Sequence, residues 1–291
     1  MPVSLSVGRG RVARAVGPAP ERPRGEGLRD RAPEWVRSDL VTYHTDATAA
    51  TGTVRITVVQ NSPDVTLDAF AGHLAADLDV VRAHDGDAVP GVDALGDGLV
   101  VLGGHVSAHD DERAPWLPAL RETLLAAATA GVPTLGIGLG AQLLAVAGGG
   151  QVAVAAPPGR EVGVTRVFWR AEAETDPVLA ALAAGEDPAR HVTSRHADAV
   201  VELPPGAVWL GSSNVYPYQA FRLGSALGVQ FHPETTRASL AAWCDADDDV
   251  DTAATLATFD EHADDLLGGG RRLAEAFVAE VRARAEDRIL V

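Results

Sequence analysis

The apolar positions of the chain follow two different periods, which alternate along the sequence. Short runs of consecutive apolar residues are typical of strands buried on both faces. Such runs lie at 54–59, 79–84, 98–104 and 132–137. Residues 66–78 and 116–130, by contrast, space their apolar side chains three or four positions apart, which predicts helices. The alternation predicts an α/β fold of three layers, in which helices flank a mixed, mostly parallel central sheet.

A second pattern begins near residue 165, where the apolar segments become short and are separated by turn residues. These segments predict a more antiparallel part of the sheet. They lie at 165–169, 190–194, 207–213, 218–224 and 226–231. After Pro233 the chain is predicted to be mostly helical, with apolar stripes over 256–266 and 273–281. Glycine runs at 148–150 and 268–270 are predicted to end helices.

Residues 1–53 depart from both patterns. They are rich in Arg, Pro and Gly and show no apolar period. Eight arginines against six acidic residues make this stretch net +2, so that a total of −16 leaves −18 for the remainder. Such a composition cannot bury enough surface to offset its ordering entropy, and we expect a disordered arm. Two alternatives stay open: the arm docks on the acidic body, or translation begins near Val54.

Residues 54–291 are expected to form one domain, of which 246–291 are a helical extension. The negative charge argues against nucleic acid and anionic membrane surfaces as partners. No apolar run approaches the roughly 18 residues that span a bilayer. The single cysteine, Cys244, excludes an intramolecular disulfide and a multi-cysteine metal site, and is consistent with a cytoplasmic location. No cofactor is predicted.

The passage from the run at 132–137 into the helix that follows is the strongest candidate for chemistry. A residue at such a strand-to-helix turn projects from the sheet edge at a helix N-terminus, where negative charge is favoured. Gly103 and Gly104 end the neighbouring predicted strand. Their backbone, together with the first amides of the helix, is therefore expected to hold a developing oxyanion.

Two motifs in this region resemble those of a known family. Gly136 to Gln142 reads GIGLGAQ, which resembles the G-I-C-x-G-x-Q nucleophile elbow of class I glutamine amidotransferases. Gly228 to Glu234 reads GVQFHPE and is similar to that family's G-x-Q-F-H-P-E block. Weaker similarities lie at 102–105, 159–163 and 196–198. The resemblance covers about 54–245, is to free-standing domains of the GMP synthase type, and implies a flavodoxin-like fold.

The resemblance also implies roles for individual residues. Members of the family hydrolyse glutamine with a Cys-His-Glu triad through a γ-glutamyl thioester, and usually deliver the ammonia to a synthase. By resemblance, His232 would be the general base and Glu234 would orient it. Gln142, with the amides of Gly104 and Leu139, would lie at the glutamine side chain and the oxyanion.

One position departs from the family pattern and decides the functional prediction. Gly138 stands where the family has its cysteine. Without a thiolate there is no covalent intermediate, and loss of the nucleophile costs on the order of 10⁶ in kcat in triad enzymes. We therefore expect a pseudoenzyme that binds glutamine, a related small molecule or a partner protein such as a synthase. The alternative is slow glutaminase chemistry, in which His232 and Glu234 activate water.

Other candidate residues give weaker signals. Cys244 is expected to be a buried apolar residue of a helix, and Ser107 has no evident base partner. His105 and His109 lack the glutamate of a helical zinc motif, and the acidic run 245–249 lacks the glycine and glutamate of a calcium loop. We expect solvated surface at these histidines, a solvated helix boundary at the acidic run, and no metal site.

Overall fold

The computed structural model describes residues 53–184, 187 and 189–289. The predicted arm, up to residue 52, lies outside the described residues and stays a prediction. The strands are β1 (Arg55–Gln60), β2 (Asp77–Arg82), β3 (Gly98–Val101), β4 (Thr134–Ile137), β5 (Gln151–Ala153), β6 (Glu161–Trp169), β7 (Ala189–His196), β8 (Ala199–Glu202), β9 (Val208–Ser212), β10 (Ala220–Leu223) and β11 (Ala226–Val229). The α-helices are α1 (Leu117–Ala130), α2 (Leu139–Ala147), α3 (Ala180–Ala183), α4 (Arg237–Asp245), α5 (Thr252–Glu261) and α6 (Ala263–Ile289). Short 3₁₀ turns are η2 (Asp68–Gly72), η3 (Ala83–Asp85), η4 (Val92–Ala94) and η5 (Ala171–Thr175).

Nine strands form one sheet in the order β2-β1-β3-β4-β11-β10-β9-β6-β7, and β5 pairs with β8 in a separate ribbon. The first five strands of that order pair in parallel. The remaining pairings are antiparallel. Following the pairings, only β10 and β6 run against the other seven strands. The mixed, mostly parallel sheet predicted from the sequence is therefore confirmed.

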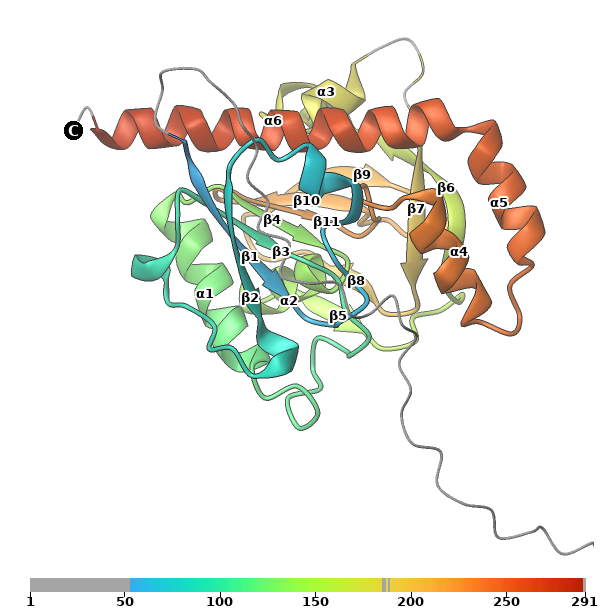
Figure 1. Ribbon diagram of the computed structural model, residues 1–291, viewed down its shortest axis with the longest axis horizontal. Coiled ribbons are helices and arrows are strands. Elements are labelled where there is room, and N and C mark those ends of the chain that lie inside the picture. The colour runs from blue at the N-terminus through green and yellow to red at the C-terminus, as the bar shows by residue number, and fades with distance from the viewer. Residues whose placement is uncertain (1–52, 185–186, 188, 290–291) are drawn as a thin grey trace, which may run out of the picture. The chain divides into compact units, whose positions relative to one another are not determined.

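Helices cover both faces of this sheet, and each face has its own apolar core (Figure 1). Alternate strand residues point to opposite sides, so that Val100 belongs to one core and Val101 to the other. Leu120 of α1 and Leu144 of α2 pack with Val101, whereas Phe277 of α6 packs with Val100. The predicted three layers are confirmed. None of the helices in the described part of the chain has the length and apolar character of a membrane span.

A helix predicted over 66–78 is wrong. Only the single 3₁₀ turn η2 forms there, and β2 already begins at Asp77, paired with Arg55 of β1. Asp68 has φ 44°, outside the right-handed helical region, and its carboxylate accepts hydrogen bonds from the backbone N and hydroxyl of Thr236 at the start of α4. Phe70 is still fully buried. The apolar spacing therefore predicted correctly that Phe70 is buried. The backbone conformation is set instead by the pairing of β2 with β1 and by the hydrogen bonds of Asp68 to the start of α4.

The glycine run at 268–270, predicted to end a helix, lies inside the 27-residue α6. A Cβ on Gly270 would lie 2.1 Å from the carbonyl oxygen of Pro233, so the helix approaches that loop more closely than any side chain permits. The run at 148–150 does follow the end of α2, as predicted. The apolar stripe over 256–266 spans the junction between α5 and α6.

A buried ionic cluster joins the antiparallel part of the sheet to α6. Arg222 of β10 lies 2.5 Å from Asp176 and 3.2 Å from Glu280 of α6. Burial opposes the charge of Arg222, but the hydrogen bonds and charges of Asp176 and Glu280 together outweigh that effect and raise its pKa. Burial raises the pKa of Glu280. The guanidinium therefore holds two carboxylates that have little access to water.

Candidate functional site

The candidate site is built around the turn between β4 and α2. Gly138 has φ 55° and ψ −110°, a backbone conformation that favours glycine because other residues are strained there. Its N–H donates to Val229 O at 2.9 Å, and its carbonyl accepts from Gln142 N at 3.1 Å. The turn is thus fixed between β11 and the first turn of α2.

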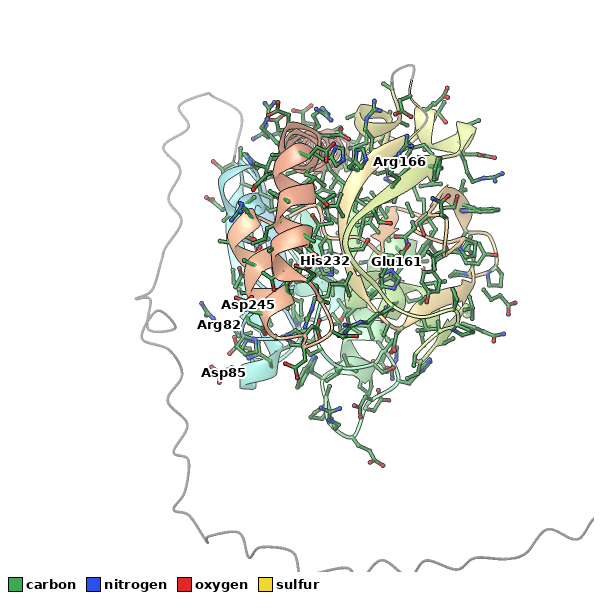
Figure 2. The ribbon with its side chains drawn as sticks, turned by 90° about the vertical axis from the view of Figure 1, so that its right-hand side faces the viewer. Arg82, Asp85, Glu161, Arg166, His232 and Asp245 are labelled. Atoms are coloured by element: carbon green, nitrogen blue, oxygen red, sulfur yellow. The ribbon has the colours of Figure 1, made fainter. Side chains whose placement is uncertain are left out.

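His232 and Glu234 follow β11 and reach this turn. Nδ1 of His232 donates to Oε1 of Glu234 at 2.7 Å, and both side chains are buried. Figure 2 shows His232 among the side chains of the domain. Because a carboxylate only accepts hydrogen bonds, Nδ1 carries a proton, and Nε2 is the ring atom that faces the elbow. A Cβ on Gly138 would lie 3.0 Å from that Nε2. Trp243 packs edge-on against the ring, with centroids 4.9 Å apart.

The end of β3 completes a corner that consists of Gly103, Gly104, Gly138, Leu139 and His232, and that is called the corner below. A Cβ on Gly103 would lie 2.9 Å from His232 Cε1, and one on Gly104 would lie 2.8 Å from Leu139 Cδ2. The two glycines therefore let the β3 loop approach both the imidazole and the start of α2. The structure brings together the residues predicted from the motifs, including Gly138 at the centre.

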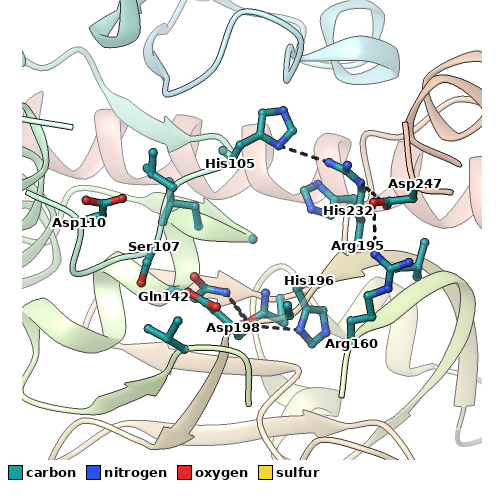
Figure 3. A pocket seen from close by; sticks show the side chains of 18 of the residues that line it. His105, Ser107, Asp110, Gln142, Arg160, Arg195, His196, Asp198, His232 and Asp247 are labelled. Atoms are coloured by element: carbon teal, nitrogen blue, oxygen red, sulfur yellow. Dashed lines mark hydrogen bonds and ion pairs between the residues drawn. The ribbon is translucent and has the colours of Figure 1, made fainter. Parts of the chain in front are cut away.

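A cavity of about 460 Å³ opens beside this corner (Figure 3). Its lining comes from the loop after β3, the start of α2, the segment from the end of β5 into β6, the end of β7 and the turn after it, the segment after β11 and the loop after α4. The residues are Gly104, His105, Val106, Ser107, Asp110, Arg113, Gly138, Leu139, Gln142, Val154, Arg160, Val162, Arg195, His196, Ala197, Asp198, Gln230, His232 and Asp247.

One wall of the cavity is charged, and the sequence analysis missed it. Arg195 Nη1 donates to His105 Nδ1 at 3.3 Å, and Asp247 Oδ2 lies 3.5 Å from Arg195 Nε (Figure 3). Asp247 Oδ1 lies 3.2 Å from Arg160 Nη1. The prediction of a solvated run at 245–249 is therefore wrong for Asp247, which is paired with two guanidiniums. These contacts join residues 52 or more positions apart, which no local pattern signals.

The opposite part of the lining is a chain of hydrogen bonds that starts at Gln142. Its Nε2 donates to Asp198 O at 2.9 Å and to Gln230 Oε1 at 3.3 Å. The same carbonyl of Asp198 lies 3.1 Å from His196 Nδ1. His196 Nε2 in turn lies 3.0 Å from Glu161 Oε2. The 159–163 and 196–198 segments thus support Gln142, the residue that the family resemblance places at the substrate.

Cys244, Ser107 and His105 lie largely as expected. Cys244 is buried in α4 with an apolar cluster, and desolvation raises the pKa of its thiol. Ser107 Oγ accepts a hydrogen bond from His109 N, and no base hydrogen-bonds to it among the described residues. His105 is exposed and bound to Asp64, whose pKa its hydrogen bond lowers. Within residues 53–184, 187 and 189–289, no cluster of three metal-ligating side chains occurs.

Solved structures with a similar fold include two amidotransferases. A glutamine amidotransferase from Thermotoga maritima superposes with a TM-score of 0.68 at 24% identity, covering 78% of this chain and 99% of that one. A glutamine amidotransferase from Methylobacillus flagellatus gives a TM-score of 0.67 at 26% identity, covering 80% of this chain and 96% of that one.

Sequence relatives agree with the fold. The glutamine-hydrolysing GMP synthase of Thermomicrobium roseum is 36% identical over 145 residues, which are 50% of this chain and 24% of the relative. The enzyme of that name from Streptococcus equi subsp. zooepidemicus is 35% identical over 140 residues, 47% of this chain and 24% of the relative. The chain thus matches about a quarter of the length of these relatives. The model of the glutamine amidotransferase class-I family matches residues 66–240, well over half of the sequence, and the chain belongs to that family.

Proposed function

We propose that this chain binds a ligand of the glutamine type in the cavity beside Gly138 and does not hydrolyse it. The observation that carries the proposal is the glycine at the elbow. Hydrolysis through a thioester requires a sulfur atom that attacks the amide carbon and expels ammonia. Position 138 offers no side chain, and the neighbouring groups are the imidazole of His232 and the backbone of Gly103.

The rest of the corner supports retention of the ligand. Gly104, Leu139 and Gln142 line the cavity next to the imidazole, where a carboxamide oxygen and nitrogen need hydrogen-bond partners. The charged wall of Arg195 and Asp247 offers one cation and one anion. An α-amino acid carries the complementary carboxylate and ammonium groups, and charge-assisted hydrogen bonds to such groups are the stronger kind.

Two measurements on the full chain test this proposal. Titration calorimetry with L-glutamine should show binding, and Gln142→Leu should weaken it. A coupled assay should detect no glutamate release above that of His232→Ala. Glutamate release that disappears in His232→Ala would reject the inactive assignment, and absence of binding would reject the ligand class.

A second candidate function is slow hydrolysis without a covalent intermediate. The 2.7 Å hydrogen bond between His232 and Glu234 favours it, because the free Nε2 faces the elbow as a general base would. General-base catalysis of water supplies about 10²–10⁴-fold. Activity that is lost in Glu234→Ala and kept in Cys244→Ala would support this candidate over binding alone.

We also propose a synthase-type protein as a partner. The support is the likeness to relatives named GMP synthase, in which the matched segment makes up 24% of the chain. Binding that tolerates substitutions in the cavity would show that the partner uses the acidic surface, and binding that requires them would place it at the cavity mouth. A cytoplasmic location stays a prediction.

A further inference from the structure

The amide of Gln142 is fixed in one orientation. A backbone carbonyl only accepts hydrogen bonds, so the Gln142 atom that lies 2.9 Å from Asp198 O is the nitrogen. The second proton of that nitrogen faces Gln230 Oε1 at 3.3 Å. The oxygen of the Gln142 amide receives no hydrogen bond from the described residues. Gln142 lines the cavity, so this oxygen is the group left for a ligand.

The carbonyl of Asp198 is itself held by a second donor. His196 Nδ1 lies 3.1 Å from it, while His196 Nε2 lies 3.0 Å from Glu161 Oε2. A carbonyl and a carboxylate both accept hydrogen bonds, so both ring nitrogens have to donate. Only the imidazolium form of His196 does so. The side chains of His196 and Glu161 are 3% and 6% exposed, which makes them a buried ion pair. His196 lines the cavity (Figure 3).

The surroundings keep Glu161 ionised. Burial opposes its charge, but hydrogen bonds from His196 and Ser213, at 3.0 and 2.7 Å, together with the charge of His196 and a hydrogen bond from Gln219, outweigh burial and lower its pKa. Gln219 Nε2 donates to the same carboxylate at 2.6 Å. The ring of Tyr216 packs 5.1 Å from that of His196, and its hydroxyl donates to backbone carbonyls instead. No other charged side chain among the described residues hydrogen-bonds His196.

We propose that His196, held as an imidazolium by Glu161, is a positioning residue that holds in place the Asp198 carbonyl to which Gln142 donates. With Asp198 O fixed as an acceptor, Gln142 presents its oxygen to the cavity. The cavity then selects a ligand group that donates an N–H, such as a carboxamide, over a carboxylate, whose oxygens would face another acceptor. The selection rests on the proposed function; the charge of His196 does not.

Titrations of the full chain with L-glutamine and L-glutamate test the selection. The wild-type chain should bind glutamine at least about tenfold more tightly, a factor typical of one buried acceptor facing another. In Glu161→Gln and His196→Gln the two affinities should fall within about threefold of each other. Thr165→Val is the matched control, because it removes only the longest contact to Glu161, at 3.5 Å, and should keep the wild-type ratio.

The charge of His196 is read separately by ¹⁵N NMR of the histidine rings in the ligand-free chain. At neutral pH both ring nitrogens of His196 should be protonated in wild type and Thr165→Val, and one should lose its proton in Glu161→Gln. A single protonated nitrogen in wild type overturns the inference even if a variant fails to fold. Glutamine binding with equal affinity for glutamate overturns the selection alone, and no binding of either probe rejects the proposed function.

Discussion

The substitution Gly138→Cys adds the one group that the corner lacks, at a position where the structure predicts a cost. The new Cβ would sit at φ 55° and 3.0 Å from His232 Nε2, so the ring has to give by a few tenths of an ångström. Holding a non-glycine residue at such a φ costs about 1–3 kcal/mol. At about 2–4 °C per kcal/mol for a domain of this size, the melting temperature should fall by roughly 2–12 °C.

The added thiol should raise the rate of glutamine hydrolysis even though the variant is less stable. Loss of the nucleophile costs on the order of 10⁶ in kcat in triad enzymes. Recovery of a thousandth of that factor would raise glutamate release about 10³-fold over wild type. The assay couples glutamate release to a dehydrogenase, and mass spectrometry after trapping with a glutamine-like alkylating agent shows whether the new thiol is reached.

Two controls isolate the sulfur. Gly138→Ala carries the same backbone strain without a nucleophile and should melt like Gly138→Cys but stay inactive. His232→Ala in the cysteine background should abolish the gain. If the introduced thiol is alkylated and the variant melts like Gly138→Ala, yet no glutamate appears, then the corner lacks more than sulfur and the reasoning is refuted.

Three further predictions concern stability. Gly270→Ala should destabilise the fold because its Cβ would lie 2.1 Å from a carbonyl oxygen. The control Gly269→Ala has only a flexible guanidinium 3.9 Å away and should gain about 1 kcal/mol in the free energy of urea unfolding. Equal stabilities of the two variants would contradict the close packing at Gly270. The pKa of Glu161 is lowered in the fold, so its contribution is present above pH 4.5 and lost as pH falls through the folded pKa. Glu161→Gln should therefore approach wild-type stability in acid, and a deficit constant with pH would count against this. Arg222→Ala should lower the free energy of unfolding by about 3–5 kcal/mol, because it leaves buried carboxylates unpaired. The loss should be smaller in acid, where Glu280 takes up a proton. A loss below about 1 kcal/mol in thermal unfolding would contradict that ion pairing.

The sequence alone predicted the sheet and the centre of the site because both depend on local signals. Consecutive apolar residues mark the inner strands, and the two motifs place Gly138 and His232 at strand ends that meet at one edge of the sheet. The failures have a common physical cause. The 66–78 segment has helical spacing, but its last two residues, Asp77 and Leu78, form the start of β2 and pair with β1. The glycines at 268–270 look like a helix end, yet they continue α6 because it passes against a loop.

The supports of the site could not be predicted for the same reason. Asp247 lies in an acidic run whose composition is typical of solvated loops, and only the fold brings Arg160 and Arg195 to it. The pairing of His196 with Glu161 joins residues 35 positions apart. The family-like segments at 159–163 and 196–198 marked these residues as part of one pattern, but the pattern carried no information on which side chain contacts which.

The contact between Gly270 and Pro233 limits how the imidazole can respond to any change at the elbow. The backbone before Glu234 already abuts the helix, so this loop has no room to retreat toward α6. Space for a larger group at residue 138 has to come from rotation of the His232 ring or from a shift toward the open cavity. The long helix α6 thus limits movement of the candidate site from behind the sheet, although it supplies no residue to the cavity lining.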